Sequence, residues 1–182
     1  MIRKLVFSGG KTMKILILNG SPHRDGNTKA LTAAFTKGAE SAGHQVVECP
    51  VGTMAIKGCL GCEYCHGKGE GKCVQKDDME KVYPELADAD MIVFASPIHY
   101  FGLAAQIQAA ICRFYAIMKP KAQKYALILS SGSPGVYAGI EGQYKGMMAF
   151  FQAEDMGIKE FNGEQNKSEA ALAEMEAFGA SL

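Results

Sequence analysis

Short segments rich in β-preferring residues alternate along the chain with longer segments in which apolar residues recur every three or four positions. The short segments predict strands, and the clearest of them, 15–18 and 91–95, are continuously apolar, as is typical of strands buried on both faces. The expected strands span residues 15–18, 45–49, 91–95, 125–129 and 157–161. The expected helices span 28–42, 77–87, 103–118, 139–155 and 168–178. This alternation predicts an α/β protein with a doubly wound, five-stranded parallel sheet.

The alternation of predicted strands and helices stops between residues 50 and 75, which contain several glycines and a group of cysteines. We expect this stretch to form an inserted, cysteine-rich loop, at 57–75, within one domain that spans 13–182. Residues 1–12 precede the first strand and are expected to be an N-terminal extension, although Leu5–Phe7 has the composition of a short extra strand.

Three polar loops directly follow predicted core strands, at 19–28, 96–102 and 130–136. The carboxyl ends of parallel strands lie at one edge of a sheet, where open α/β proteins bind ligands. The three loops are therefore expected to meet at one ligand site.

The first loop has the composition of a phosphate site at a helix N-terminus. Ser21, Asn27 and Thr28 can donate hydrogen bonds, Arg24 supplies positive charge, and Gly26 gives the backbone freedom. The loop lacks both G-x-x-x-x-G-K-[ST] and G-x-G-x-x-G, which argues against an ATP-type phosphate loop and the dinucleotide fingerprint. An ordinary helix-capping turn would use the same residue types, so both interpretations stay open at this point.

The segment Gly20-Ser-Pro-His-Arg-Asp-Gly-Asn-Thr28 resembles the G-S-P-R-x-x-G-N-T loop of the flavodoxin-like NADPH-dependent FMN reductases and the related iron–sulfur flavoproteins. The resemblance implies a flavodoxin-like fold and an FMN phosphate held by Ser21, Arg24, Asn27 and Thr28. His23, between Pro22 and Arg24, departs from the family pattern.

The loop at 96–102 is similar to the family's S-P-I-Y-[FW]-[FWG] segment and is expected to hold the flavin ring. A planar ring needs an apolar or aromatic wall and backbone groups for its polar edge. The wall would comprise Pro97, Ile98, Tyr100 and Phe101, with Gly102 supplying backbone groups. His99 stands where the family usually has Tyr; it is a candidate to hydrogen-bond the ring or act on a proton near it, or it merely packs.

The third loop contributes Ser131, Gly132 and Gly135, which are expected near the ribityl chain or the dimethylbenzene side of the flavin. The helix after the second loop is similar to the family's A-Q-x-K-x-x-x-D-R pattern. Gln106 and Arg113 match that pattern, whereas Gln108 and Cys112 depart from it.

The spacing C-x2-C-x2-C-x7-C, formed by Cys59, Cys62, Cys65 and Cys73, is a candidate metal site. Three thiolates at this spacing can wrap a cuboidal [4Fe–4S] cluster, whereas a single zinc ion more often uses two separate pairs of ligands. Free thiols or a redox disulfide are the alternative. The motif and the following V-x-x-D-D-M segment resemble those of the iron–sulfur flavoproteins.

Lysine and arginine balance aspartate and glutamate, so the formal net charge is zero and neither nucleic acid nor a membrane surface is expected as a partner. Cysteines without an export signal favour a reducing, cytoplasmic location. The resemblance implies an FMN-dependent oxidoreductase, a homodimer or homotetramer, that takes electrons from NAD(P)H or a carrier and passes them to a small-molecule or protein acceptor. The alternatives are an electron-transfer module without substrate turnover and a zinc-stapled structural module.

Overall fold

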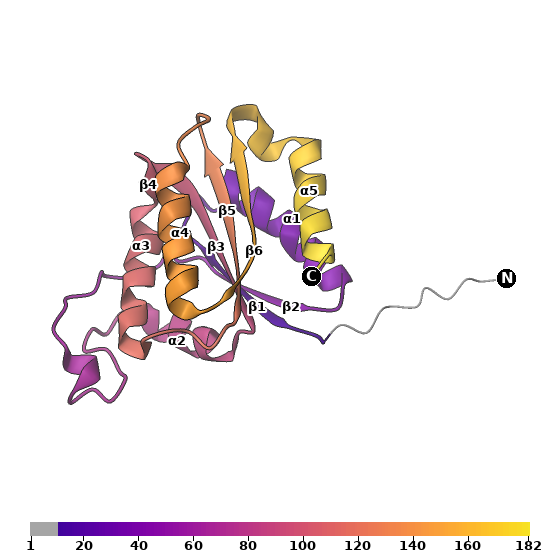
Figure 1. Cartoon of the computed structure of the whole chain (residues 1–182). Coiled ribbons are helices and arrows are strands. Elements are labelled where there is room, and N and C mark those ends of the chain that lie inside the picture. Colours follow the sequence, from indigo (N-terminus) through magenta and orange to yellow (C-terminus); the bar gives the residue numbers. More distant parts are fainter. Residues whose placement is uncertain (1–10) are drawn as a thin grey trace.

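The computed structural model describes residues 11–182, which contain one sheet of parallel strands in the order β2-β1-β3-β5-β6 (Figure 1). A short strand, β4, pairs antiparallel with the end of β3. The order is that of a flavodoxin-like doubly wound sheet, which confirms the predicted fold class. The suggested strand at Leu5–Phe7 lies outside the described residues. The strands are β1 (Lys14–Asn19), β2 (Gln45–Cys49), β3 (Met91–His99), β4 (Gly102–Leu103), β5 (Lys124–Ser131) and β6 (Glu154–Asn162).

Helices cover both faces of the sheet. On one face lie α1 (Asn27–Ser41) and α5 (Glu169–Ala180), and on the other lie α2 (Met79–Asp88), α3 (Ala105–Cys112) and α4 (Ala138–Phe151) (Figure 1). Three short 3-10 helices complete the described elements: η1 (Tyr64–His66), η2 (Arg113–Ile117) and η3 (Gly163–Lys167).

Alternate residues of each central strand pack into two separate hydrophobic cores, one on each face of the sheet. In β1, Leu16 and Leu18 pack toward α2, α3 and α4, while Ile15 and Ile17 pack toward α1 and α5. These four side chains are fully buried. The strand is therefore apolar at successive positions because both of its faces are covered.

Several element boundaries differ from the sequence predictions. β3 continues through Ser96 to His99, so about half of the expected loop at 96–102 is strand, because Ser96 and Pro97 still pair with β5 and Ile98 and His99 pair with β4. The helix expected over 139–155 ends at Phe151, since Glu154 begins the pairing of β6 with β5. Tertiary pairing thus overrides the local apolar pattern in both segments.

The helix expected over 103–118 ends at Cys112 and tightens into η2, which is followed by Met118, a residue with a positive φ of 62°. Pro84 does not break α2. Ser168 caps the last helix, because its Oγ accepts a hydrogen bond from the Ala171 amide at 3.2 Å.

Among residues 11–182, no helix combines the length and apolar character needed to cross a bilayer.

Candidate cofactor sites

A cavity of about 340 Å³ opens at the carboxyl edge of the sheet, which is within the range of about 300–1,000 Å³ usual for ligand pockets. It lies where β1, β3 and β5 end, as the sequence predicts. Its wall consists of Ser21, His23, Gly26, Asn27, Thr28, Pro97, Ile98, His99, Ser130, Ser131, Gly132, Gly163 and Asn166.

The N-terminus of α1 forms one end of this cavity. Gly26 is the N-cap residue, and within the described residues no side chain caps this helix end and no acidic residue occupies its first turn. The first backbone N–H groups of a helix lack intrahelical partners, and the helix dipole adds partial positive charge. This end of the cavity is therefore suited to bind an anion such as phosphate.

Two hydroxyl groups meet below this helix end. Thr28 Oγ1 and Ser130 Oγ lie 2.8 Å apart, and both residues are buried. Each hydroxyl can donate or accept, so either can turn its proton toward a bound oxyanion.

Gly52, just after β2, lets the loop that follows β1 approach the backbone closely, because glycine has no side chain. The Gly52 amide donates to the Asn19 carbonyl at 2.9 Å, and a Cβ at Gly52 would collide with the Ser21 carbonyl. On the other side of the loop, the Ser21 amide donates to Asn19 Oδ1 at 2.9 Å. No role for Gly52 is predictable from the sequence, because this close approach arises only when β2 packs beside β1.

A two-residue hairpin turn connects β3 to β4, with His99 paired to Gly102. Its central residues, Tyr100 and Phe101, have φ of 51° and 65°, a left-handed conformation that costs bulky residues about 1–2 kcal/mol each. Tyr100 is fully exposed and Phe101 is 66% exposed. Two strained, exposed aromatic rings thus stand beside the cavity rather than in its wall.

The cavity brings together most of the site residues predicted from sequence. Arg24, Tyr100, Phe101, Gly102 and Gly135 lie outside its wall, so their roles stay predictions. The predicted residues in the wall are Ser21, Gly26, Asn27, Thr28, Pro97, Ile98, His99, Ser131 and Gly132.

Asn166, in η3, is a wall residue that sequence reasoning missed. It is buried, and its Nδ2 donates to the carbonyls of Ser131 at 2.9 Å and Gly163 at 2.7 Å. Its Oδ1 has no partner among the described residues. An unpaired buried acceptor in the wall fits a ligand hydroxyl, such as one on a ribityl chain. His23, Ser130 and Gly163 were also missed.

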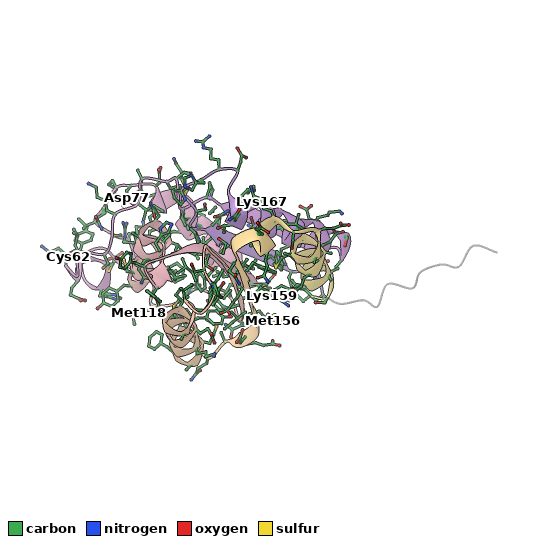
Figure 2. All side chains as sticks on the ribbon, turned by 90° about the horizontal axis from the view of Figure 1, so that it is seen from above. Cys62, Asp77, Met118, Met156, Lys159 and Lys167 are labelled. Atoms are coloured by element: carbon green, nitrogen blue, oxygen red, sulfur yellow. The ribbon has the colours of Figure 1, made fainter. Side chains whose placement is uncertain are left out.

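A second, much smaller cavity lies within the cysteine-rich loop, beside the carboxyl end of α3. Its wall contains Cys59, Cys62, Cys65, Cys73 and Arg113, and it has room for about 10 Å³, the size of one water molecule. Figure 2 places Cys62 and Asp77 at one end of the molecule, away from Lys167, which lies beside the larger cavity.

An ion pair fixes the ends of this loop. Arg113 Nη1 donates to Asp77 Oδ2 at 2.7 Å and to the Lys57 carbonyl at 2.9 Å. Asp77 also accepts from the amides of Lys57 and Met79, each at 3.1 Å. Burial opposes the charge of Asp77, but the hydrogen bonds from Arg113 and the two amides hold its carboxyl pKa below the usual value.

Contacts with η2 hold the middle of the loop. His66 Nε2 lies 2.9 Å from the Tyr115 carbonyl, and the two rings meet edge to face. Tyr115 Oη donates to Glu63 at 2.8 Å. Near the start of the loop, the Cys59 amide donates to Cys112 Sγ at 3.1 Å, so Cys112 at the end of α3 supports the cysteine-rich loop.

The four cysteines of the motif all belong to the wall of the small cavity. Burial raises the pKa of the Cys65 thiol, and the charges of Cys73 and Cys59 raise it further. Within the part of the chain that the structure describes, no three His, Cys, Asp or Glu side chains are close enough to hold a single metal ion. Cys59 and Cys62 are exposed, Cys65 is buried and Cys73 is intermediate, and a set of four thiolates is the donor chemistry that a [4Fe–4S] cluster uses.

The strand order defines a flavodoxin-like protein, and its cavity at the carboxyl edge has the uncapped N-terminus of α1 in its wall. Residues 13–166 match the family model of the NADPH-dependent FMN reductases, and the chain belongs to this family.

The chain is similar to curated and solved members of related groups. It is 34% identical over 130 residues to an iron–sulfur flavoprotein of Archaeoglobus fulgidus, covering 70% of this chain and 56% of the relative. It is 35% identical over 106 residues to an iron–sulfur flavoprotein of Methanocaldococcus jannaschii, covering 58% and 52%. The chain thus spans about half the length of the curated relatives it matches.

Solved structures share the fold. An NAD(P)H:quinone oxidoreductase from Methanothermobacter marburgensis superposes with a TM-score of 0.70 at 16% identity, over 93% of this chain and 96% of the other. An FMN-dependent NADH-azoreductase from Bacillus anthracis gives a TM-score of 0.65 at 14% identity, over 92% and 98%.

Proposed function

We propose that this protein binds FMN in the cavity at the carboxyl edge and acts as an oxidoreductase, passing electrons from NAD(P)H or a carrier to an acceptor. The uncapped N-terminus of α1 in the cavity wall is the observation that carries the proposal, because it is a ready site for the FMN phosphate. The bound FMN would supply the redox chemistry, and the protein would bind, orient and shield it.

The cavity wall and the hairpin beside it have separate roles in this proposal. Asn27 and the hydroxyl groups of Ser21 and Thr28 bind the phosphate, together with the free amides of α1. Asn166 Oδ1 accepts a hydrogen bond from the ribityl chain. The apolar wall at Pro97–Ile98 carries the flavin ring, and Tyr100 and Phe101 shield its open side.

We also propose that Cys59, Cys62, Cys65 and Cys73 hold a [4Fe–4S] cluster. Support comes from the four thiols that share one cavity and from the similarity to proteins named iron–sulfur flavoproteins. A bound cluster would exchange single electrons.

The second candidate function is an electron-transfer flavoprotein without substrate turnover. The exposure of Cys59 and Cys62 favours it, because a cluster near the surface suits exchange of electrons with a protein partner.

Anaerobic rapid mixing of the FMN-loaded protein with NADPH or NADH tests the proposed function. The oxidoreductase proposal expects the flavin absorbance to bleach with at least one dinucleotide, at a rate that saturates with its concentration. Reduction by dithionite with no reduction by either dinucleotide would refute direct NAD(P)H oxidation and favour the electron-transfer candidate.

A further inference from the structure

Arg113 is a buried cation, and only some of its N–H donors have hydrogen-bond partners. It lies where α3 passes into η2, and its side chain is 1% exposed. A guanidinium has five N–H donors, and burying them without partners is unfavourable. Nη1 uses both of its hydrogens, on Asp77 and on the Lys57 carbonyl.

The remaining donors of Arg113, on Nε and Nη2, have no partner among the described residues. The ion pair with Asp77 and the attachment of the loop need only Nη1. A role confined to holding the loop in place therefore leaves three buried N–H groups unexplained.

Arg113 forms part of the wall of the small cavity, together with the four cysteines of the motif. Glu63 is the carboxylate in that wall, but it is exposed and accepts its hydrogen bond from Tyr115 Oη at 2.8 Å. The cavity has room for about one water molecule, which can accept two hydrogen bonds and so cannot satisfy all three donors. The wall also contains Gln75, whose Nε2 donates to the Gly58 carbonyl at 2.9 Å. Outside the wall, Tyr83 Oη lies beside the guanidinium and donates to the Arg113 carbonyl at 3.2 Å, so one hydroxyl oxygen is near the three donors. The most numerous acceptors in the wall are the four thiol sulfurs.

We propose that Arg113 donates hydrogen bonds from Nε and Nη2 to the sulfur atoms of the group held by Cys59, Cys62, Cys65 and Cys73, and thereby sets its reduction potential. The inference rests on the proposed cluster. Hydrogen bonds to cluster sulfurs and nearby positive charge stabilise the more negative, reduced state, so Arg113 raises the potential.

The primary test uses the 182-residue chain, purified anaerobically and reconstituted with iron and sulfide. The potential is measured by spectroscopically monitored redox titration. Arg113→Met is expected to shift the cluster potential to more negative values by about 59 mV or more, which is a tenfold change in a one-electron equilibrium. Arg113→Lys keeps the charge but not the fork of donors, so a smaller shift in the same direction is expected.

His66→Phe is the matched control. It removes the contact between His66 Nε2 and the Tyr115 carbonyl, at 2.9 Å, which holds the middle of the loop, and it leaves the guanidinium of Arg113 and its partners in place. The inference expects an unchanged potential in this variant. Equal shifts in His66→Phe and Arg113→Met would show that loosening the loop is sufficient, and would overturn the inference.

A measurement on the unmutated protein remains decisive if the Arg113 variants fail to fold. With ¹⁵N-labelled arginine, electron spin-echo spectroscopy of the reduced cluster is expected to show a ¹⁵N coupling. The coupling should persist in Arg24→Lys, because Arg24 lies on the loop after β1, outside the cysteine cavity. Absence of the coupling would refute contact between Arg113 and the cluster.

Iron and sulfide content separates the two possible failures. A protein that takes up no iron and sulfide refutes the cluster and this inference together. The protein can also take up iron and sulfide but show no ¹⁵N coupling and no change of potential in Arg113→Met. That result would support the cluster and refute only the role of Arg113.

Discussion

Replacing Thr28 by Val tests the phosphate end of the large cavity with a nearly isosteric change. Thr28 is 1% exposed, and its Oγ1 lies 2.8 Å from Ser130 Oγ. Both Thr and Val are β-branched and have similar helix propensities, so α1 should be retained. The substitution removes one hydroxyl at the helix end that we propose binds phosphate.

The size of the effect follows from the charge of the ligand. A hydrogen bond to a charged group contributes about 1.5–3 kcal/mol, which corresponds to about a 10- to 150-fold loss of FMN affinity. In the cofactor-free protein, the same change leaves the buried Ser130 hydroxyl without its partner and costs about 1–3 kcal/mol of stability. Adding Ser130→Ala to Thr28→Val should recover part of that stability without recovering FMN affinity.

Riboflavin, which has the same ring and ribityl chain but no phosphate, is the control ligand. Flavin fluorescence titrations with both ligands are expected to show weaker FMN binding in Thr28→Val and nearly unchanged riboflavin binding. An equal loss of affinity for both ligands would refute the assignment of Thr28 to the phosphate, as would unchanged binding of both.

Three other changes have defined outcomes. Replacing Tyr100 by Asn and Phe101 by Gly relieves the left-handed backbone strain of the hairpin. Chemical denaturation should therefore show a gain of about 1 kcal/mol in stability, while FMN affinity falls because the two rings are lost. Unchanged FMN affinity would exclude the two rings from the site. Gly52→Ala forces a Cβ against the Ser21 carbonyl, so urea denaturation should show a loss of about 1–3 kcal/mol, together with weaker FMN binding; full stability would disprove the close contact. Burial raises the pKa of the Cys49 thiol from 9.0 to about 11, so its stabilising contribution is present below pH 9 and is lost as the pH rises through about 11. Cys49→Ala should therefore lose less stability than the unmutated protein across that window, and parallel pH profiles of unfolding free energy would contradict the shift.

The parts of the fold and site that were predictable from sequence are local. The apolar runs at 15–18 and 91–95 are strands with both faces covered by helices. Such strands can be recognised from sequence because they are continuously apolar. Ser21, Asn27 and Thr28 form one contiguous strand–turn–helix segment, so their meeting at the cavity needs no long-range information.

The parts that were not predictable depend on packing between distant segments. Asn166 reaches the cavity only because η3 follows β6 at the same sheet edge. The hairpin at Tyr100 and Phe101 lacks the Asn-Gly pair that usually indicates such a turn, so it was expected to be a loop. Arg113 matched a family pattern, but its burial against Asp77 emerged only from the docking of the cysteine-rich loop on α3 and η2.

The central claim is that the cavity at the carboxyl edge of the sheet binds FMN. The most direct test is the absorbance spectrum of the anaerobically purified protein, followed by titration with FMN and chromatographic identification of the released flavin. The account predicts a yellow protein that binds one FMN per chain, or takes it up to that level when FMN is added. A folded protein that binds no FMN, even with excess ligand, would contradict it.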